Sequence, residues 1–199
     1  AAAQSSGASL YVPPGTYNVS GLTIPGNVSV FGDGRSKSII KSTTNAAIVS
    51  LVEGTGVSQF RGPSIRDLGI TGLVSAGTAQ VGLLATDDQY MFNVRVDGVQ
   101  VLNTGGDGVY IGNVYSSWFS DLYISGAHEF ALHYNAENMP DNLFTKVYVG
   151  DVTIYKATAY RVRGGEFTCY TCNGINNVVA GSVWAAVGRK AGVDGDTIS

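Results

Sequence analysis

The 199-residue sequence contains few charged residues and no block of one sign. Asp, Glu, Lys and Arg make up 14% of it, against about 25% in an average soluble protein. The formal net charge is −3. Duplex nucleic acid is bound by clustered Lys and Arg, so we exclude it as the main partner. Disorder is also disfavoured, because disordered chains contain few aromatic residues, whereas 10% of this chain is aromatic.

Long hydrophobic runs are also missing. No apolar run reaches the roughly 18 residues that a membrane-spanning helix needs, so the sequence predicts no membrane insertion. The most apolar late stretch, 178–187, is interrupted by Gly181 and Ser182. The chain begins AAAQSSG, without a Met or the basic segment of a signal peptide. We therefore expect a processed chain or a fragment of a longer protein.

Cysteine is scarce, and the short motifs that could bind metals or phosphates are incomplete. Cys169 and Cys172 are too few for a disulfide framework and lack the second pair of a zinc site. The HExxH zinc motif needs its two histidines four residues apart on a helix. His133 instead follows His128 by five residues, and the segment is predicted to be a strand. The segment 32–38 lacks the spacing of a phosphate loop. We predict no metal site and no cofactor.

Glycine, in contrast, is abundant, and its spacing is regular. The 27 glycines are about twice the average share of about 7%. Several of these glycines stand at the end of a short segment of alternating apolar and polar residues. This alternation is the pattern of half-buried strands between tight turns. Five recur at intervals of 24 to 28 residues: Gly72, Gly98, Gly126, Gly150 and Gly174. A second set of strands is predicted between them, at 81–85, 108–112, 130–134 and 157–162.

A repeat of this length built only from strands and turns predicts an all-β fold, a parallel β-helix of about seven rungs. Stacked rungs about 4.8 Å apart bury a core that one rung cannot form. The leucine pattern of a leucine-rich repeat is absent, and a β-sandwich would not restart its strands at this period. We assign 1–7 to the end of a capping helix, 8–175 to the β-helix and 176–199 to a last rung or C-terminal extension.

Two segments carry a family resemblance. Residues 9–34, SLYVPPGTYNVSGLTIPGNVSVFGDG, and 65–72, IRDLGITG, resemble the first rungs of the pectate-lyase-like superfamily of right-handed, single-stranded parallel β-helices. The run from Val12 to Tyr17 is the most specific piece. The resemblance covers about residues 8–175. Members usually begin with an alanine-rich helix, and the opening residues look like its last turn before the glycine stop at Gly7.

Within this superfamily, segments 115–138 and 143–151 resemble bacteriophage tailspikes and phage-type capsular depolymerases. The resemblance implies a homotrimer in the virion tail that binds bacterial capsule or lipopolysaccharide and cleaves it by glycoside hydrolysis or β-elimination. Two alternatives stay open: a non-enzymatic receptor-binding or structural spike, and a secreted bacterial polysaccharide lyase or epimerase. The Asp-Pro-His signature of the epimerases is absent from 108–112. Consecutive rungs carry no carboxylate cluster for a calcium-dependent lyase.

Asp107 and Glu129 are the first candidates for catalysis, because each comes just before a strand of the second set. At matching positions their carboxylates would lie about one rung, or 5 Å, apart, as in a retaining glycosidase. Mutual repulsion would then give one acid and one base. The alternative is that both are turn residues, since Asp107-Gly108 is a strong turn dipeptide. Glu137 lies in 135–142, a predicted loop that could shape a binding groove.

Aromatic residues gather in the middle rungs, and their flat faces can stack on sugar rings. Tyr110, Tyr134 and Tyr160 fall in the second set of strands and are predicted to form one exposed ladder. Trp118 is a further candidate for sugar contact. Arg161 follows in the same region and could hold an anionic sugar through paired hydrogen bonds. The competing interpretation is an aromatic stack in the core or at a subunit contact.

Overall fold

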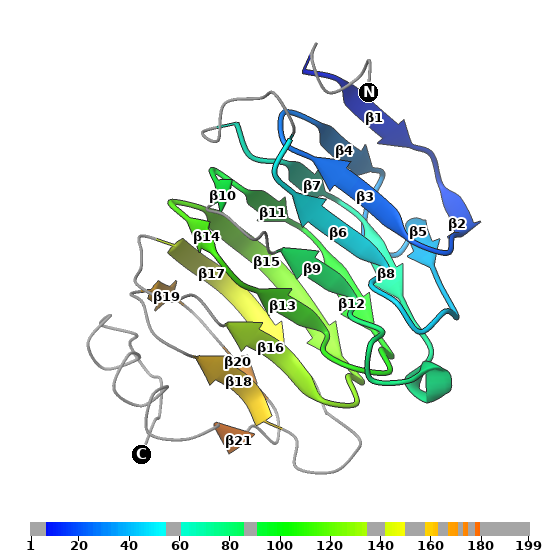
Figure 1. Cartoon of the computed structure of the whole chain (residues 1–199), viewed down its shortest axis with the longest axis vertical. Helices are drawn as coiled ribbons and strands as arrows, with labels where there is room; N and C mark the ends of the chain where they lie inside the picture. Colours follow the sequence, from blue (N-terminus) through cyan, green and yellow to red (C-terminus); the bar gives the residue numbers. More distant parts are fainter. Residues whose placement is uncertain are drawn as a thin grey trace.

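The computed structural model describes residues 7–54, 61–85, 91–134, 142–149, 158–162, 167–170, 173–174 and 178–179, with side chains through His133 and at Val147. Short strands wind into stacked turns (Figure 1). Every strand pair in these ranges is parallel. The predicted parallel β-helix is thus confirmed. The predicted helix remnant and the C-terminal extension lie almost wholly outside the described residues.

The first sheet contains the strand that opens each turn. Along the coil these are β1 (Ser9–Val12), β4 (Ser29–Gly32), β7 (Ser64–Arg66), β11 (Arg95–Asp97), the first half of β15 (Trp118–Ser125), the first half of β17 (Asn142–Val149) and β19 (Phe167–Tyr170). The register aligns one apolar residue from each turn, so that Val30, Ile65, Val96 and Phe119 form a buried column. Seven turns are present in the described part.

The second sheet continues each turn after a sharp corner. The strands β15 and β17 cross this corner and connect the second sheet to the first as one 12-stranded hydrogen-bonded sheet. We keep the two names for its two faces. The second sheet contains β2 (Gly15–Asn18), β5 (Ser38–Lys41), β8 (Gly69–Thr71), β12 (Gln100–Leu102), the second halves of β15 and β17, and β20 (Asn173–Gly174). Its buried column consists of Ile40, Ile70, Val101 and Ile124. The 3-10 turn η1 (Val74–Ala76) follows β8. No helix in the described residues is long and apolar enough to cross a membrane.

The third sheet closes each turn. It contains β3 (Leu22–Pro25), β6 (Val49–Val52), β9 (Leu83–Ala85), β13 (Val109–Ile111), β16 (Phe130–Tyr134), β18 (Thr158–Val162) and β21 (Val178–Val179). The four strands predicted between the glycines are therefore confirmed as β9, β13, β16 and β18. Val49, Leu83, Val109 and Leu132 form its buried column. A short ladder of β10 (Met91–Phe92) and β14 (Val114–Tyr115) lies outside the three sheets.

Left-handed residues form the corner between the first and second sheets. Asp67, Gly98 and Asp121 have φ of 55°, 62° and 48°. The backbone N–H of Asp67 donates to the carbonyl of Asp97, and that of Gly98 donates to Ser120. Asp and Gly tolerate this conformation better than bulky residues. The three turns therefore bend at the same place.

The next corner shows that the glycine repeat has a different alignment from the predicted one. The N–H of Gly72 donates to Leu102, and the N–H of Asn103 donates to Ser125. Asn103 and Gly126 both have positive φ. Asn103 thus occupies in its turn the position of Gly72 and Gly126, whereas Gly98 lies at the preceding corner. The period was predicted correctly, but the glycine series combines two corners.

Gln80 connects three turns inside the coil. Its side chain is fully buried, and no charged side chain is buried among the described residues. The Gln80 amide group donates to the carbonyls of Ser42 and Thr44, and its Oε1 accepts from the N–H groups of Leu73 and Gly105. All hydrogen-bonding atoms of the buried amide are therefore satisfied.

Replacing Gln80 by Leu keeps the volume but removes the acceptor of two backbone N–H groups. We expect the free energy of unfolding to fall by about 2–4 kcal/mol, because unpaired buried polar groups are costly. Urea denaturation of the Gln80→Leu variant measures the change. Gln100→Leu, at a half-buried position of β12, serves as the control and should change stability by about 0.5 kcal/mol or less. Equal losses in the two variants would contradict the connecting role of Gln80.

Candidate functional site

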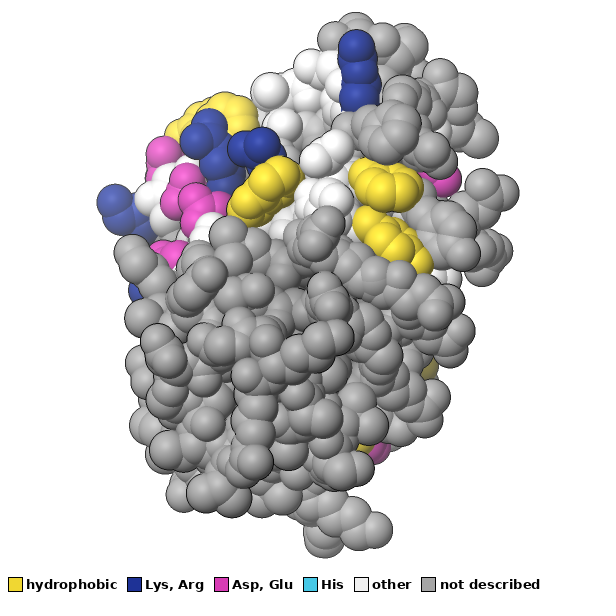
Figure 2. Space-filling model, turned by 90° about the vertical axis from the view of Figure 1, so that its left-hand side faces the viewer, with side chains coloured by type: hydrophobic (Ala, Val, Ile, Leu, Met, Phe, Trp, Pro, Cys, Tyr) yellow, Lys and Arg dark blue, Asp and Glu magenta, His cyan; other side chains and the backbone are white. Residues whose placement is uncertain are grey.

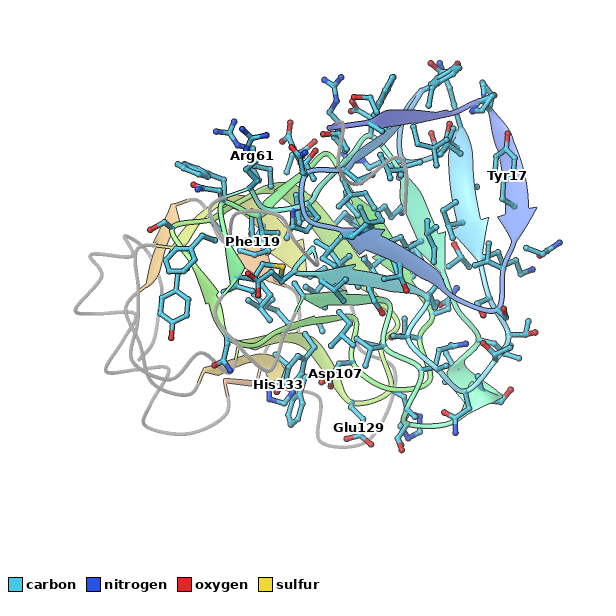
Figure 3. The ribbon with its side chains drawn as sticks, turned by 45° about the horizontal axis from the view of Figure 1, so that its top comes forward. Tyr17, Arg61, Asp107, Phe119, Glu129 and His133 are labelled. Carbon is cyan, nitrogen blue, oxygen red and sulfur yellow. The ribbon has the colours of Figure 1, made fainter. Side chains whose placement is uncertain are left out.

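Asp107 lies on the corner loop that leads from the second sheet into β13. Its Oδ1 accepts a hydrogen bond from the backbone N–H of Phe130 at 3.0 Å. Its Oδ2 lies 2.7 Å from Nδ1 of His133. Both partners belong to β16, one turn further along the coil. The carboxylate is therefore held between two consecutive turns, and Figure 3 shows its side chain next to that of His133.

Aromatic rings surround His133 on the third sheet. The register places His133 beside Tyr110. The centroid of its imidazole lies 4.5 Å from that of Tyr110 and 5.3 Å from that of Phe130, both edge to face. The side chains of His133 and Asp107 are 13% and 12% exposed. The rings hold the imidazole plane in place and leave a small accessible part, as a group that exchanges a proton with a ligand requires.

The contact with Asp107 determines which nitrogen of His133 carries hydrogen. An ionised carboxylate only accepts hydrogen bonds, so Nδ1 of His133 must be the donor. In the neutral imidazole Nε2 is then the acceptor. His133 can take up a proton at Nε2, while Asp107 fixes the orientation of the ring and stabilises the charge that forms. Asp107 is therefore placed to position the imidazole of His133.

Gly108 permits the close packing of the loop at Asp107. A Cβ atom at Gly108 would lie 2.5 Å from Cγ2 of Ile124 and 2.7 Å from the carbonyl oxygen of Ala131. Neither Asp107 nor Gly108 has a positive φ. Position 108 therefore needs glycine because the next turn packs closely against it. It does not need glycine for a positive φ, which the Asp-Gly turn dipeptide had suggested.

The predicted pairing of Asp107 with Glu129 is wrong by one residue. The register that puts Val109 beside Leu132 brings Phe130, and not Glu129, next to Asp107. The N–H of Glu129 instead donates to the carbonyl of Gly106 at 3.3 Å. The Glu129 side chain is exposed. The two carboxylates do not occupy one column, and a catalytic role of Glu129 stays a prediction.

The predicted tyrosine ladder is also wrong. Tyr110 lies beside His133, and His133 lies beside Arg161. Tyr134 and Tyr160 belong to two other columns of the third sheet. The register thus forms a column of a tyrosine, a histidine and an arginine on consecutive turns. The side chains of Tyr134, Tyr160 and Arg161 lie outside the described residues.

Trp118 belongs to a different face from Asp107 and His133. It begins β15 in the first sheet, is 40% exposed, and lies beside Arg95. The Arg95 guanidinium lies 4.8 Å from the centroid of the Trp118 ring. Figure 2 shows hydrophobic, basic and acidic side chains next to one another on one face of the described part. Trp118 therefore does not join the Asp107–His133 pair. Glu137 lies outside the described residues.

His133 is the functional candidate that sequence reasoning missed, because it was considered only as a zinc ligand. A usable signal was present: His133 follows Asp107 by 26 residues, close to the repeat length. Two residues separated by one repeat lie on neighbouring turns. Among the described residues, no three His, Cys, Asp or Glu side chains form a group that could hold a metal ion.

Comparison with known protein families gives a match over most of the chain. The sequence profile of the family described as rhamnogalacturonase A/epimerase, pectate lyase-like, matches residues 1–181. A comparison with curated proteins gives no significant match.

Solved structures of similar fold include the catalytic domain of a GH87 α-1,3-glucanase in complex with tetrasaccharides. It has a TM-score of 0.54 and 16% identity, over 83% of this chain and 34% of that chain. A pectin methylesterase in complex with a hexasaccharide has a TM-score of 0.46 and 14% identity, over 89% and 85% of the two chains. Pre-mature bacteriophage phi29 gene product 12 has a TM-score of 0.45 and 15% identity, over 87% and 31%. The chain spans about a third of the glucanase, and such identities show the fold alone.

The Asp107–His133 contact predicts the tautomer of His133. In the wild-type protein, ¹⁵N NMR of the imidazole should show hydrogen on Nδ1 and an unprotonated Nε2 at alkaline pH. In Asp107→Asn this preference should weaken, because an amide can both donate and accept. His128, whose Nδ1 has no hydrogen-bond partner in the described structure, serves as the internal control. A wild-type His133 with hydrogen on Nε2 would contradict the assignment.

Proposed function

Because the chain belongs to the rhamnogalacturonase A/epimerase family of pectate lyase-like proteins, we propose that it forms part of an enzyme that acts on a polysaccharide, with His133 at the reacting centre. The single observation that carries the proposal is the 2.7 Å contact between Asp107 and His133. A carboxylate that orients a partly exposed imidazole is a common arrangement for general-base catalysis.

The chemistry of the site favours β-elimination over glycoside hydrolysis. Hydrolysis by the usual route needs two carboxyl groups on either side of the glycosidic bond. Both oxygens of Asp107 are engaged by β16, and the predicted partner Glu129 is out of register. Elimination needs a base and a cation for the sugar carboxylate. His133 supplies the base, and Arg161, next in the same column, is the candidate cation.

In the proposed step, Nε2 of His133 takes the proton from the carbon next to the carboxylate of a uronic acid residue. The electron pair left behind forms a carbon–carbon double bond as the glycosidic C–O bond on the next carbon breaks. The leaving oxygen takes a proton from water, and His133 returns its proton to solvent. Asp107 stabilises the imidazolium that forms between these events.

The biological setting that we propose is a tailspike-type protein that binds bacterial capsule or lipopolysaccharide as a homotrimer outside the cell. Its support is the resemblance of 115–138 and 143–151 to phage tailspikes. A secreted bacterial lyase would use the same centre. A purely structural spike would need no oriented histidine, and the Asp107–His133 pair therefore favours an enzyme.

Activity should depend on His133 and Asp107. With polygalacturonate or a uronic-acid-containing capsule, the full-length protein should produce unsaturated uronate, followed by its ultraviolet absorbance. His133→Gln and Asp107→Asn should each lower kcat by about 100-fold or more, the usual contribution of a general base. Asp97→Asn is the control, because Asp97 lies on the first sheet and accepts a hydrogen bond from Ser120; its activity should not change.

Full activity of His133→Gln would overturn the proposed centre. New reducing ends without unsaturated product, abolished by Glu129→Gln, would replace elimination by hydrolysis at Glu129.

The homotrimer is tested separately. Light scattering of the full-length protein should give three times the mass of one chain at micromolar concentration. A mass of one chain over the same range would contradict the tailspike setting and leave the reacting centre in place, because Asp107 and His133 belong to the same chain.

A further inference from the structure

The outer face of the first sheet carries two columns of side chains, because residues two apart in a strand point to the same side. The first column contains Ser9, Ser29, Ser64, Arg95 and Trp118. The second column contains Tyr11, Phe31, Arg66, Asp97 and Ser120. None of these side chains is buried. Each turn from β1 to β15 therefore presents one residue of each column on a face that is separate from the Asp107–His133 pair.

The two columns are complementary in size. In the turns of β1, β4 and β7, a serine occupies the first column and a large side chain occupies the second. In the turns of β11 and β15 the order reverses. Arg95 and Trp118 now occupy the first column, and the smaller Asp97 and Ser120 occupy the second. If a second copy lies parallel at the same height, its second column can face the first column of its neighbour, and each large side chain then meets a small one.

Aromatic and arginine side chains form the raised parts of this face. Tyr11 is 47% exposed and Trp118 is 40% exposed. The guanidinium of Arg66 lies 5.0 Å from the ring centroid of Phe31, and Arg95 stacks on Trp118 in the same way. Tyr, Trp and Arg supply much of the binding energy at protein–protein contacts. Stacking holds both guanidinium groups in place before binding, which lowers the entropy cost of a contact.

The charges of the face favour the same alignment. Among the described residues, neither Arg95 nor Asp97 forms a salt bridge. The two belong to one strand, β11, but to different columns. Parallel copies at equal height would place Asp97 of one copy opposite Arg95 of the next, while Arg66 would meet Ser64. The hydroxyl of Ser120 donates to Oδ1 of Asp97 at 2.6 Å and so orients the carboxylate.

We propose that this face is the contact between copies of the chain, with parallel coils and the second column of one copy against the first column of the next. Such a contact joins two different parts of the surface, and contacts of this kind close into rings with cyclic symmetry. The inference rests on the homotrimer of the proposed function and assigns a contact surface to it. Trp118 then packs against a neighbouring copy, in place of the predicted contact with sugar.

Reversing charges tests the contact. Arg95→Asp should raise the dissociation constant of the full-length trimer at least about tenfold, because two carboxylates then face each other. Arg95→Asp/Asp97→Arg should restore the assembly, because opposite charges meet again with their places exchanged. Lys37→Glu reverses the charge of an exposed lysine outside both columns and should leave the assembly unchanged. Sedimentation velocity over a dilution series measures the mass, and circular dichroism checks that each variant is folded.

Trp118→Ala removes the largest side chain of the face and should weaken the assembly by a similar factor. A trimer of unchanged stability in either folded variant, Arg95→Asp or Trp118→Ala, would overturn the contact and leave the homotrimer in place. So would a folded double variant that stays dissociated, because only the parallel alignment brings positions 95 and 97 together. A wild-type protein with the mass of one chain would contradict the homotrimer and the contact with it. Polysaccharide cleavage tests the reacting centre separately, because Asp107 and His133 belong to one chain.

Discussion

The register of the parallel ladders is the constraint on which the structure depends. Each turn contributes one apolar residue to each inner column, and the columns fill only if neighbouring strands keep their alignment. A slip of one residue would turn every inner side chain outward. Corner residues with positive φ keep the register by bending the chain at equal points, as Asp67 and Asp121 do. The same alignment brings polar residues of different turns into contact on the outer faces.

The Asp107–His133 pair is a direct product of this alignment. The carboxylate of Asp107 contacts two donors on β16, which belongs to the next turn. The pair therefore forms only when the two turns are stacked. Gly108 permits the approach, since a side chain there would strike Ile124 and Ala131 of the next turn. The pairing of this carboxylate with the imidazole therefore needs tight stacking of the two turns as well as the two side chains.

The sequence predicted the fold and its strands because period and apolar alternation are local properties. It did not predict the register, since Asn103 forms a corner in one turn where Gly72 forms it in another, and turns differ in length. The candidate site depends on the register: Asp107 was singled out from the sequence, but Glu129 was aligned with it, whereas its contacts are Phe130 and His133. The tyrosine ladder failed for the same reason. An error of one residue in the strand alignment leaves the predicted fold unchanged, but it changes which side chains lie next to each other.

The contact between consecutive turns also affects how such a protein can change in evolution. Insertion of a whole turn between Asp107 and His133 would separate them by about 4.8 Å more and dismantle the pair. Duplication or loss of turns elsewhere along the coil would leave the pair untouched. Added or lost turns on either side would therefore give the coil new surfaces without disturbing this pair, as long as its two turns stay adjacent.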